Sequence, residues 1–296
     1  MSINKRILFF LLISFLVFLP IYGHIQENDF NYNKHEKIIN KEFYAPFQYR
    51  YVSYFINFSL ANMFLFLGKG IAITLSTFLI NFILCFFSII LFDRLLNEYK
   101  TTEKNFIIML FLLIICFMRF SPSCTLIPID NMINLFFIIA GLIFIKKNDF
   151  KKLILTVFLG SFFREAILIL VFIYFILNRN EIKKTIFLAI SGIVPLLSIR
   201  LFFGKFLYRY SLIRIFYFSF DRIMTTLIYL VPFLILIYLS YLGKKVYRES
   251  FYSKIWLAIP FYLIIIILIG MPRETRLFLP LLPVMSPLIY EYIKKI

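Results

Sequence analysis

Two acidic residues, Glu27 and Asp29, follow shortly after the first apolar run of the chain. In an extended segment, side chains two residues apart point to the same side of the backbone. Two carboxylates held in this way can bind one Mg²⁺ or Mn²⁺ ion, since both ions prefer oxygen ligands. Alternatively, one of them can accept a proton from an attacking hydroxyl. Both roles stay open beside that of two solvated loop acids, and Glu36 and Glu42 of the same loop compete for either role.

Arginines supply the second chemical signal, because a guanidinium binds phosphate through two parallel hydrogen bonds. Arg50 ends the run Ala45-Pro46-Phe47-Gln48-Tyr49-Arg50. Arg164 and Glu165 interrupt an apolar stretch from 153 to 177, where ionised groups usually face a cavity or a partner. The plainer alternatives are an arginine that reaches lipid headgroups at Arg50 and a structural ion pair at Arg164-Glu165.

A third charged group, Arg273, Glu274 and Arg276, lies between two strongly apolar runs. Its arginines are predicted to lie on the outer side, whereas positive charge is usually enriched on the cytoplasmic side. We therefore expect them to bind a phosphate or diphosphate group. The alternative is a solvated loop. Asp130 follows Pro128 at the start of another predicted helix, where it is an N-cap or a partner of Arg119.

The composition restricts the class of protein. Of the 296 residues, 62% are hydrophobic, which excludes an ordinary soluble domain. The net charge of +17 comes mostly from short loops between apolar runs, which is the pattern of positive-inside membrane proteins rather than of nucleic-acid binding. The same charge favours anionic membrane lipids as partners. With two histidines, His24 and His35, a histidine-based zinc site is not expected.

The apolar runs predict an all-α, polytopic membrane protein of about ten helical segments in a single domain, 1–296. Lys- and Arg-rich connectors and the C-terminal tail are assigned to the cytoplasm, as is the N-terminus, because Lys5 and Arg6 precede an apolar run that we interpret as an uncleaved signal anchor. The predicted segments are 7–22, 71–92, 106–119, 131–145, 153–163, 166–177, 185–203, 223–243, 253–271 and 277–291.

Four of these segments are short. With basic connectors on one side, residues 106–145 and 153–177 must each leave and return to that side. Segments of about 11 to 15 residues are about 16 to 22 Å long as helices, whereas the hydrocarbon core is about 30 Å thick. We therefore predict hairpin helices that stop part-way and line a water-accessible cavity. The alternative is one continuous span over 153–177.

The outer face then collects the longest loop, residues 23–70. Its second part, Pro46 to Phe66, is rich in aromatic residues and predicts a helix that lies in the membrane interface.

The chain resembles the GT-C class of membrane glycosyltransferases in four features taken together. They are many spans, a Glu-x-Asp pair after the first span, a long first outer loop and short hairpin helices. The runs Pro46-Phe47-Gln48-Tyr49-Arg50, Phe163-Arg164-Glu165-Ala166 and Glu274-Thr275-Arg276-Leu277 are similar to segments of bacterial members. The resemblance implies a plasma-membrane enzyme that takes a sugar from a polyprenyl-phosphate carrier on the outer face. It also implies that Asp29 is the catalytic carboxylate, with Glu27 its partner.

On this hypothesis, Asp29 is the base and arginines stabilise the departing lipid phosphate, so that a metal is not required. The donor would contact Arg50, Asp130, Arg164, Glu165, Arg273, Glu274 and Arg276. A transporter, flippase or polymerase of lipid-linked glycans would use the same arginines without needing Asp29. A membrane scaffold without chemistry is the third alternative.

Overall fold

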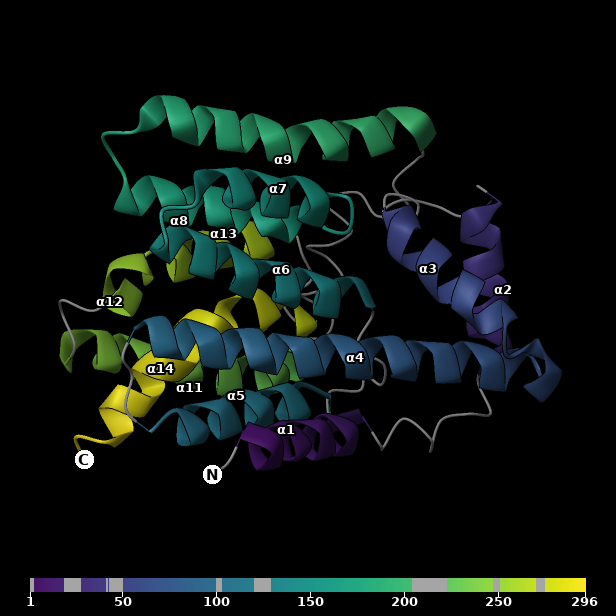
Figure 1. Ribbon diagram of the computed structural model, residues 1–296, viewed down its shortest axis with the longest axis horizontal. Coiled ribbons are helices and arrows are strands. Elements are labelled where there is room, and N and C mark those ends of the chain that lie inside the picture. Colours follow the sequence, from purple (N-terminus) through teal and green to yellow (C-terminus); the bar gives the residue numbers. More distant parts are fainter. Residues whose placement is uncertain are drawn as a thin grey trace.

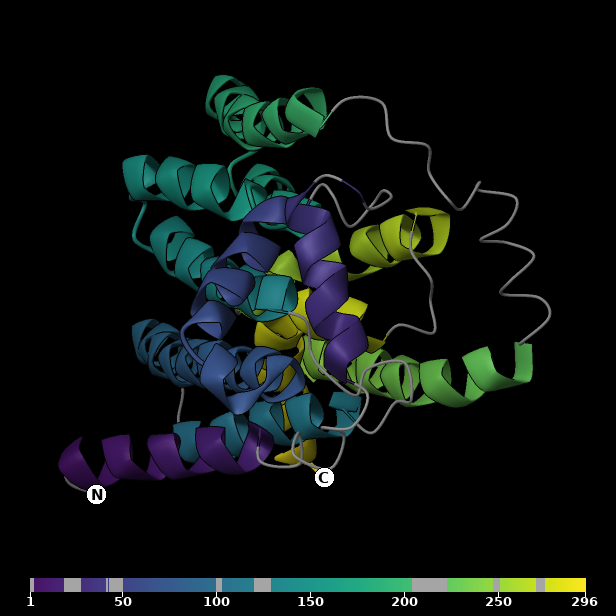
Figure 2. The same ribbon diagram turned by 90° about the vertical axis from the view of Figure 1, so that its right-hand side faces the viewer.

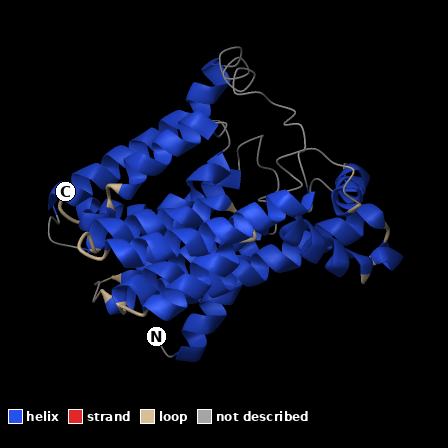
Figure 3. Cartoon of the chain, turned by 90° about the horizontal axis from the view of Figure 1, so that it is seen from above, coloured by secondary structure: helices blue, strands red, loops and turns tan. Residues whose placement is uncertain are grey.

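The computed structural model describes residues 3–18, 28–40, 42, 50–99, 103–119, 129–203, 223–246, 251–269 and 275–296. Every regular element in these residues is a helix (Figure 3). The expected all-α fold is therefore confirmed for this part of the chain. The longer helices are α1 (Ile3–Phe18), α2 (Asn28–Ile39), α3 (Tyr51–Asn62), α4 (Lys69–Glu98), α5 (Lys104–Arg119), α6 (Ile129–Lys146), α7 (Phe150–Ser161), α8 (Ile169–Leu177), α9 (Ile182–Phe203), α11 (Ile223–Val246), α13 (Ala258–Ile269) and α14 (Leu282–Ile293).

Each of the ten predicted apolar segments overlaps a helix, because a long apolar run satisfies its backbone hydrogen bonds internally only as a helix. Three helices among the described residues are long and apolar enough to cross a membrane: Lys69–Glu98, Ile129–Lys146 and Ile182–Phe202. The other apolar helices searched are shorter, at 10–17 residues. The described helices thus suggest membrane association, while ten separate crossings remain a prediction.

The two predicted hairpins have different outcomes. Helix α6 has 18 residues, so it is longer than the predicted 15 and is long and apolar enough to cross a membrane; its role as a hairpin arm stays a prediction. In the second hairpin, α7 ends at Ser161 and a short 3₁₀ helix, η5 (Glu165–Leu168), leads into α8. The chain reverses direction between α7 and α8 (Figure 1), so residues 153–177 form two short helices instead of one continuous span.

The basic connectors gather at one end of the bundle. Both termini lie at this end (Figure 1). Contacts across it tie connectors together: Lys147 pairs with Glu98 at 2.7 Å, and Lys294 approaches Glu103 at 3.9 Å. We call this the termini end; its assignment to the cytoplasm stays a prediction.

Helices α2 and α3 lie beyond the opposite end of most of the bundle and pack against the first half of α4 (Figures 1 and 2). The predicted interfacial helix is confirmed as a helix at Tyr51–Asn62. Helix α2 was missed, because its sequence NDFNYNKHEKII is polar overall, although its Tyr32 and Ile38 are buried. Its contacts with α3 and α4 stabilise it instead, as is common for helices of low intrinsic stability.

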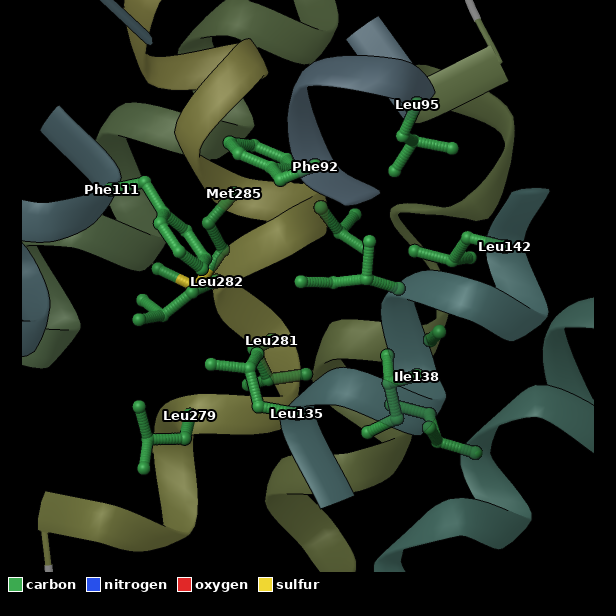
Figure 4. Close-up of a cluster of buried hydrophobic side chains, with 14 of the residues drawn as sticks. Phe92, Leu95, Phe111, Leu135, Ile138, Leu142, Leu279, Leu281, Leu282 and Met285 are labelled. Atoms are coloured by element: carbon green, nitrogen blue, oxygen red, sulfur yellow. The ribbon is translucent and has the colours of Figure 1, made fainter. Parts of the chain in front are cut away.

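The core lies where α4, α5, α6 and α14 meet. Figure 4 shows Phe92 of α4, Phe111 of α5, Leu135 of α6 and Met285 of α14 in one buried cluster. The rings of Phe92 and Phe111 stack with centroids 4.6 Å apart. This packing fixes the position of α6, which carries Asp130 at its first turn.

Candidate functional site

Three of the charged residues singled out in the sequence meet at the end of the bundle that carries α3. The Oδ2 atom of Asp130 lies 3.2 Å from Nη1 of Arg164 and 3.4 Å from Nη1 of Arg50. The side chains of Asp130 and Arg164 are each 3% exposed, and that of Arg50 is 13% exposed. We call Arg50, Asp130, Arg164 and Glu165 the charged cluster.

Each member of the charged cluster sits at a break in secondary structure. Arg50 immediately precedes α3, and Asp130 lies in the first turn of α6, where the helix dipole favours a carboxylate. Arg164 is extended, with φ −162° and ψ 141°, in the turn between α7 and η5. Segments far apart in the sequence therefore converge through their helix ends.

Glu165 begins η5 directly beside Arg164, and its side chain keeps accessible surface. Protein atoms around the carboxyl hinder its solvation, which alone would raise its pKa; the guanidinium groups of Arg50 and Arg164 outweigh this effect and lower the pKa below its usual range. Glu165 is therefore ionised at neutral pH. Tyr262 of α13 is buried within electrostatic range of Arg50, Arg164 and Glu165.

The formal charges of the cluster balance, with two guanidinium groups against two carboxylates. Buried charges of this kind persist where they are paired and hydrogen-bonded, because an isolated buried ion is strongly unfavourable. An anion that enters the cluster must therefore displace a carboxylate from an arginine, or bring a further cation into play. The exposed Glu165 is the more readily displaced of the two carboxylates.

Of the two acids that the sequence placed first, Asp29 has a described backbone, and this backbone lies away from the charged cluster. The backbone of α2 is helical from Asn28, so Asp29 does not lie in the expected extended segment; its side chain and Glu27 are outside the described residues. Helices α2 and α3 run antiparallel, since Tyr32 donates to Asn62 and His35 pairs with Asn57.

This antiparallel pairing separates Asp29 from Arg50. Asp29 is six residues before His35, about 9 Å along α2, and Arg50 is seven residues before Asn57, about 10 Å in the opposite direction along α3. The two residues are thus about 20 Å apart along the helix axes. The structure brings Arg50 to Asp130, Arg164 and Glu165, and it does not bring Asp29 to them.

The remaining predicted site residues are described in part. Arg273 and Glu274 lie outside the described residues. The backbone of Arg276 belongs to the 3₁₀ helix η6 (Thr275–Leu281), which packs against α6, although its side chain is not described. Helix α6 begins at Ile129, so Asp130 lies in its first turn and not at the predicted N-cap position. There it forms an ion pair with Arg164. The side chain of Arg119, its other proposed partner, is not described.

Two polar features were not recognised in the sequence. Asn57 of α3 links three helices: its Nδ2 donates to Thr77 Oγ1 at 2.9 Å and lies 3.1 Å from His35 Nε2. His35 thus belongs to a helix rather than to a loop. The second feature is Asn131 and Asn134 beside Asp130, both of which are buried. A polar residue within the predicted helix 131–145 was the available signal for Asn134.

A metal centre finds no support in the part of the chain that the structure describes. No three side chains among His, Cys, Asp and Glu come together there. The Asp130 carboxylate is engaged by two arginines. The question of a metal at Glu27 and Asp29 falls on side chains that are not described.

The chain matches no protein-family model, and comparisons with curated proteins and with solved structures also give no match.

Proposed function

We propose that this chain is a polytopic membrane glycosyltransferase that moves a sugar from a polyprenyl-phosphate donor to a glycan, lipid or protein acceptor. The observation that carries the proposal is the pair of arginines, Arg50 and Arg164, which share the Asp130 carboxylate at one end of an apolar helical bundle. A lipid-linked phosphate needs both elements: apolar surface for the chain and guanidinium groups for the headgroup.

The arrangement of the bundle supports an outer-face reaction. The charged cluster lies at the end away from the termini end, to which the basic connectors belong (Figure 1). If the termini end faces the cytoplasm, as the positive-inside rule predicts, the cluster faces the outer side of a plasma membrane. The short helices α7 and α8 hold Arg164 between them in the turn.

In the proposed reaction, the acceptor hydroxyl oxygen bonds to the anomeric carbon of the sugar while the bond from that carbon to the phosphate oxygen breaks. The electron pair of the broken bond stays on the phosphate, whose growing charge Arg50 and Arg164 stabilise. The hydroxyl proton passes to a carboxylate base.

The geometry favours Glu165 over Asp29 as that base. A base must lie within hydrogen-bond reach of the attacking hydroxyl, which itself lies next to the phosphate-bearing carbon. Glu165 adjoins Arg164 and is ionised, whereas Asp29 is about 20 Å from Arg50 along the helix axes.

The test is sugar transfer in membranes supplied with radiolabelled polyprenyl-phosphate sugars. We expect Glu165→Gln to abolish transfer at an unchanged protein level, and the matched carboxylate-to-amide variant Asp29→Asn to retain it. Loss of transfer in Asp29→Asn, with full transfer in Glu165→Gln, would refute the placement of the donor site at the charged cluster. No transfer by the native chain, with lipid-linked glycan still bound, would favour a flippase, transporter or polymerase.

A further inference from the structure

Two buried amides on α6 have atoms without a hydrogen-bond partner among the described residues. Asn131 is 3% exposed and Asn134 is 1% exposed. The Nδ2 atoms of both residues and Oδ1 of Asn134 make no hydrogen bond within the described part of the chain. Native proteins seldom leave such groups unpaired, because burial removes their hydrogen bonds to water without replacement. Two amides within four residues, both unpaired among the described residues, therefore point to a further hydrogen-bonding partner, and a bound ligand is one that would serve both.

Helical geometry shows where Asn134 points. Asp130, Asn134 and Gly141 fall within about 40° of one another around α6, and Asn134 lies about 6 Å beyond Asp130 along the axis. Asp130 contacts Arg164, and Gly141 packs closely on the Leu170 side chain. Asn134 lies between these two contacts on the same face, so it faces the segment that runs from the charged cluster into α8.

Asn131 points toward the neighbouring side of the same face. It lies one helical turn before Leu135, which meets Leu281 of η6 in the buried cluster of Figure 4. The three polar residues Asp130, Asn131 and Asn134 thus form one arc of about 100° at the beginning of α6. One edge of this arc faces η5, and the other faces η6.

We propose that Asn131 and Asn134 form a subsite that binds the hydroxyl groups of the donor sugar, next to the arginines that bind its phosphate. This inference rests on the proposed function and names what each side chain recognises. A carboxamide offers both donors and an acceptor, which suits a ring that carries several hydroxyl groups. A spacing of about one helical turn between Asp130 and Asn134 suits a sugar directly linked to a phosphate.

Access to the subsite runs past Glu165. Arg164 is 3% exposed, whereas the adjacent Glu165 is exposed. The buried arginine therefore lies one residue from the molecular surface. Helix geometry places Asn134 toward the turn after α7 and the short 3₁₀ helix η5, which contacts α6. A donor that displaces this segment would reach the amides after its phosphate meets Arg50 and Arg164.

Asparagine-to-leucine changes separate a binding role from a structural one. Leu resembles Asn in shape and removes the unpaired amide, so Asn134→Leu and Asn131→Leu should unfold at the native temperature or above it. Ser88→Ala is the matched control, because Ser88 Oγ on α4 is also buried without a partner among the described residues. All three variants remove an unpaired polar atom, but two of them alter the proposed subsite.

Binding is measured on the purified full chain with polyprenyl phosphate and with polyprenyl-phosphate glucose, mannose, galactose and arabinose. We expect the native chain and Ser88→Ala to prefer at least one sugar-bearing lipid. Each Asn variant should lose about tenfold in affinity for that lipid and keep its affinity for the sugar-free lipid.

The outcomes distinguish the two proposals. An Asn134→Leu chain that keeps the native sugar preference would overturn the subsite while leaving the arginine site in place. A native chain that binds all five lipids equally would do the same. A native chain that binds none of them would overturn the proposed function and the subsite together.

Discussion

Replacing Asp130 with Asn removes the carboxylate that Arg50 and Arg164 share. The two guanidinium groups would then lie near each other in a poorly solvated site, with Glu165 as the one remaining carboxylate of the charged cluster. Because Arg164 is 3% exposed, it cannot recover solvation without local rearrangement. We therefore expect Asp130→Asn to be the most destabilising single charge removal in the charged cluster.

The distances set the magnitude of this effect. At 3.2 and 3.4 Å, each ion pair has a Coulomb energy of about 5 kcal/mol at an effective dielectric constant of about 20. Desolvation offsets much of that energy, and breaking a buried pair typically costs about 3–5 kcal/mol. Arg164→Met should cost less, because Asp130 keeps Arg50 as its partner. The double variant should be more stable than Asp130→Asn alone, since it removes one of the uncompensated guanidinium groups.

The assay is equilibrium unfolding of the purified chain in mixed micelles, titrated with a denaturing detergent and followed by far-ultraviolet circular dichroism. Glu181→Gln is the control, because Glu181 and Lys184 form an exposed pair in which the side chains are 40% and 51% exposed. Exposed pairs add little to stability, and the amide oxygen of the variant can still accept the hydrogen bond that Tyr174 donates to Glu181, so this variant should unfold nearly like the native chain. An Asp130→Asn chain as stable as Glu181→Gln, or one more stable than Arg164→Met, would refute the role of the shared carboxylate.

Three further changes test other parts of the structure. Gly243→Ala places a methyl group onto the backbone carbonyl of Leu288, so it should force α11 and α14 apart and lower the yield of folded protein in an expression assay. Gly141→Ala meets a movable Leu170 side chain, so its effect on the yield should be milder. His35→Phe removes an acceptor from the buried Asn57 amide and should cost about 1–3 kcal/mol by detergent unfolding, while His35→Gln, which can still accept a hydrogen bond, should cost less. Arg164→Lys keeps the charge and loses the bidentate geometry, so it should greatly reduce sugar transfer; a native transfer rate would refute bidentate phosphate binding by Arg164.

The helical segments could be predicted from the sequence because a long apolar run in a membrane satisfies its backbone hydrogen bonds internally by forming a helix. The prediction failed where length and tertiary contacts decide. Residues 131–145 appeared too short for a span, but the helix extends to Ile129 and Lys146 and includes polar residues at its start. Helix α2 is polar overall, and its position depends on contacts such as that between Tyr32 and Asn62.

The candidate site was predictable residue by residue but not as an arrangement. Arg50, Asp130 and Arg164 each stood out because a charge beside apolar sequence needs a partner. Nothing in their spacing indicated that one carboxylate would serve both arginines, because this depends on how three helix ends pack. The same packing separates Asp29 from Arg50, which an argument based on sequence order could not anticipate.

The balance of charge in the cluster bears on why it exists. An apolar replacement of a buried ion-pair network is often as stable as the network itself, so stability alone is weak grounds for keeping Arg50, Asp130 and Arg164 in a bundle made mostly of Phe, Ile and Leu. A purely structural ion-pair cluster would not need the buried Asn131 next to Asp130 and the buried Asn134 one turn further on, whose amide nitrogens are unpaired among the described residues. The proposed binding of a donor phosphate by the arginines and of its sugar hydroxyl groups by the amides would account for both features together. Losses of sugar binding in variants that fold normally are therefore the decisive observation.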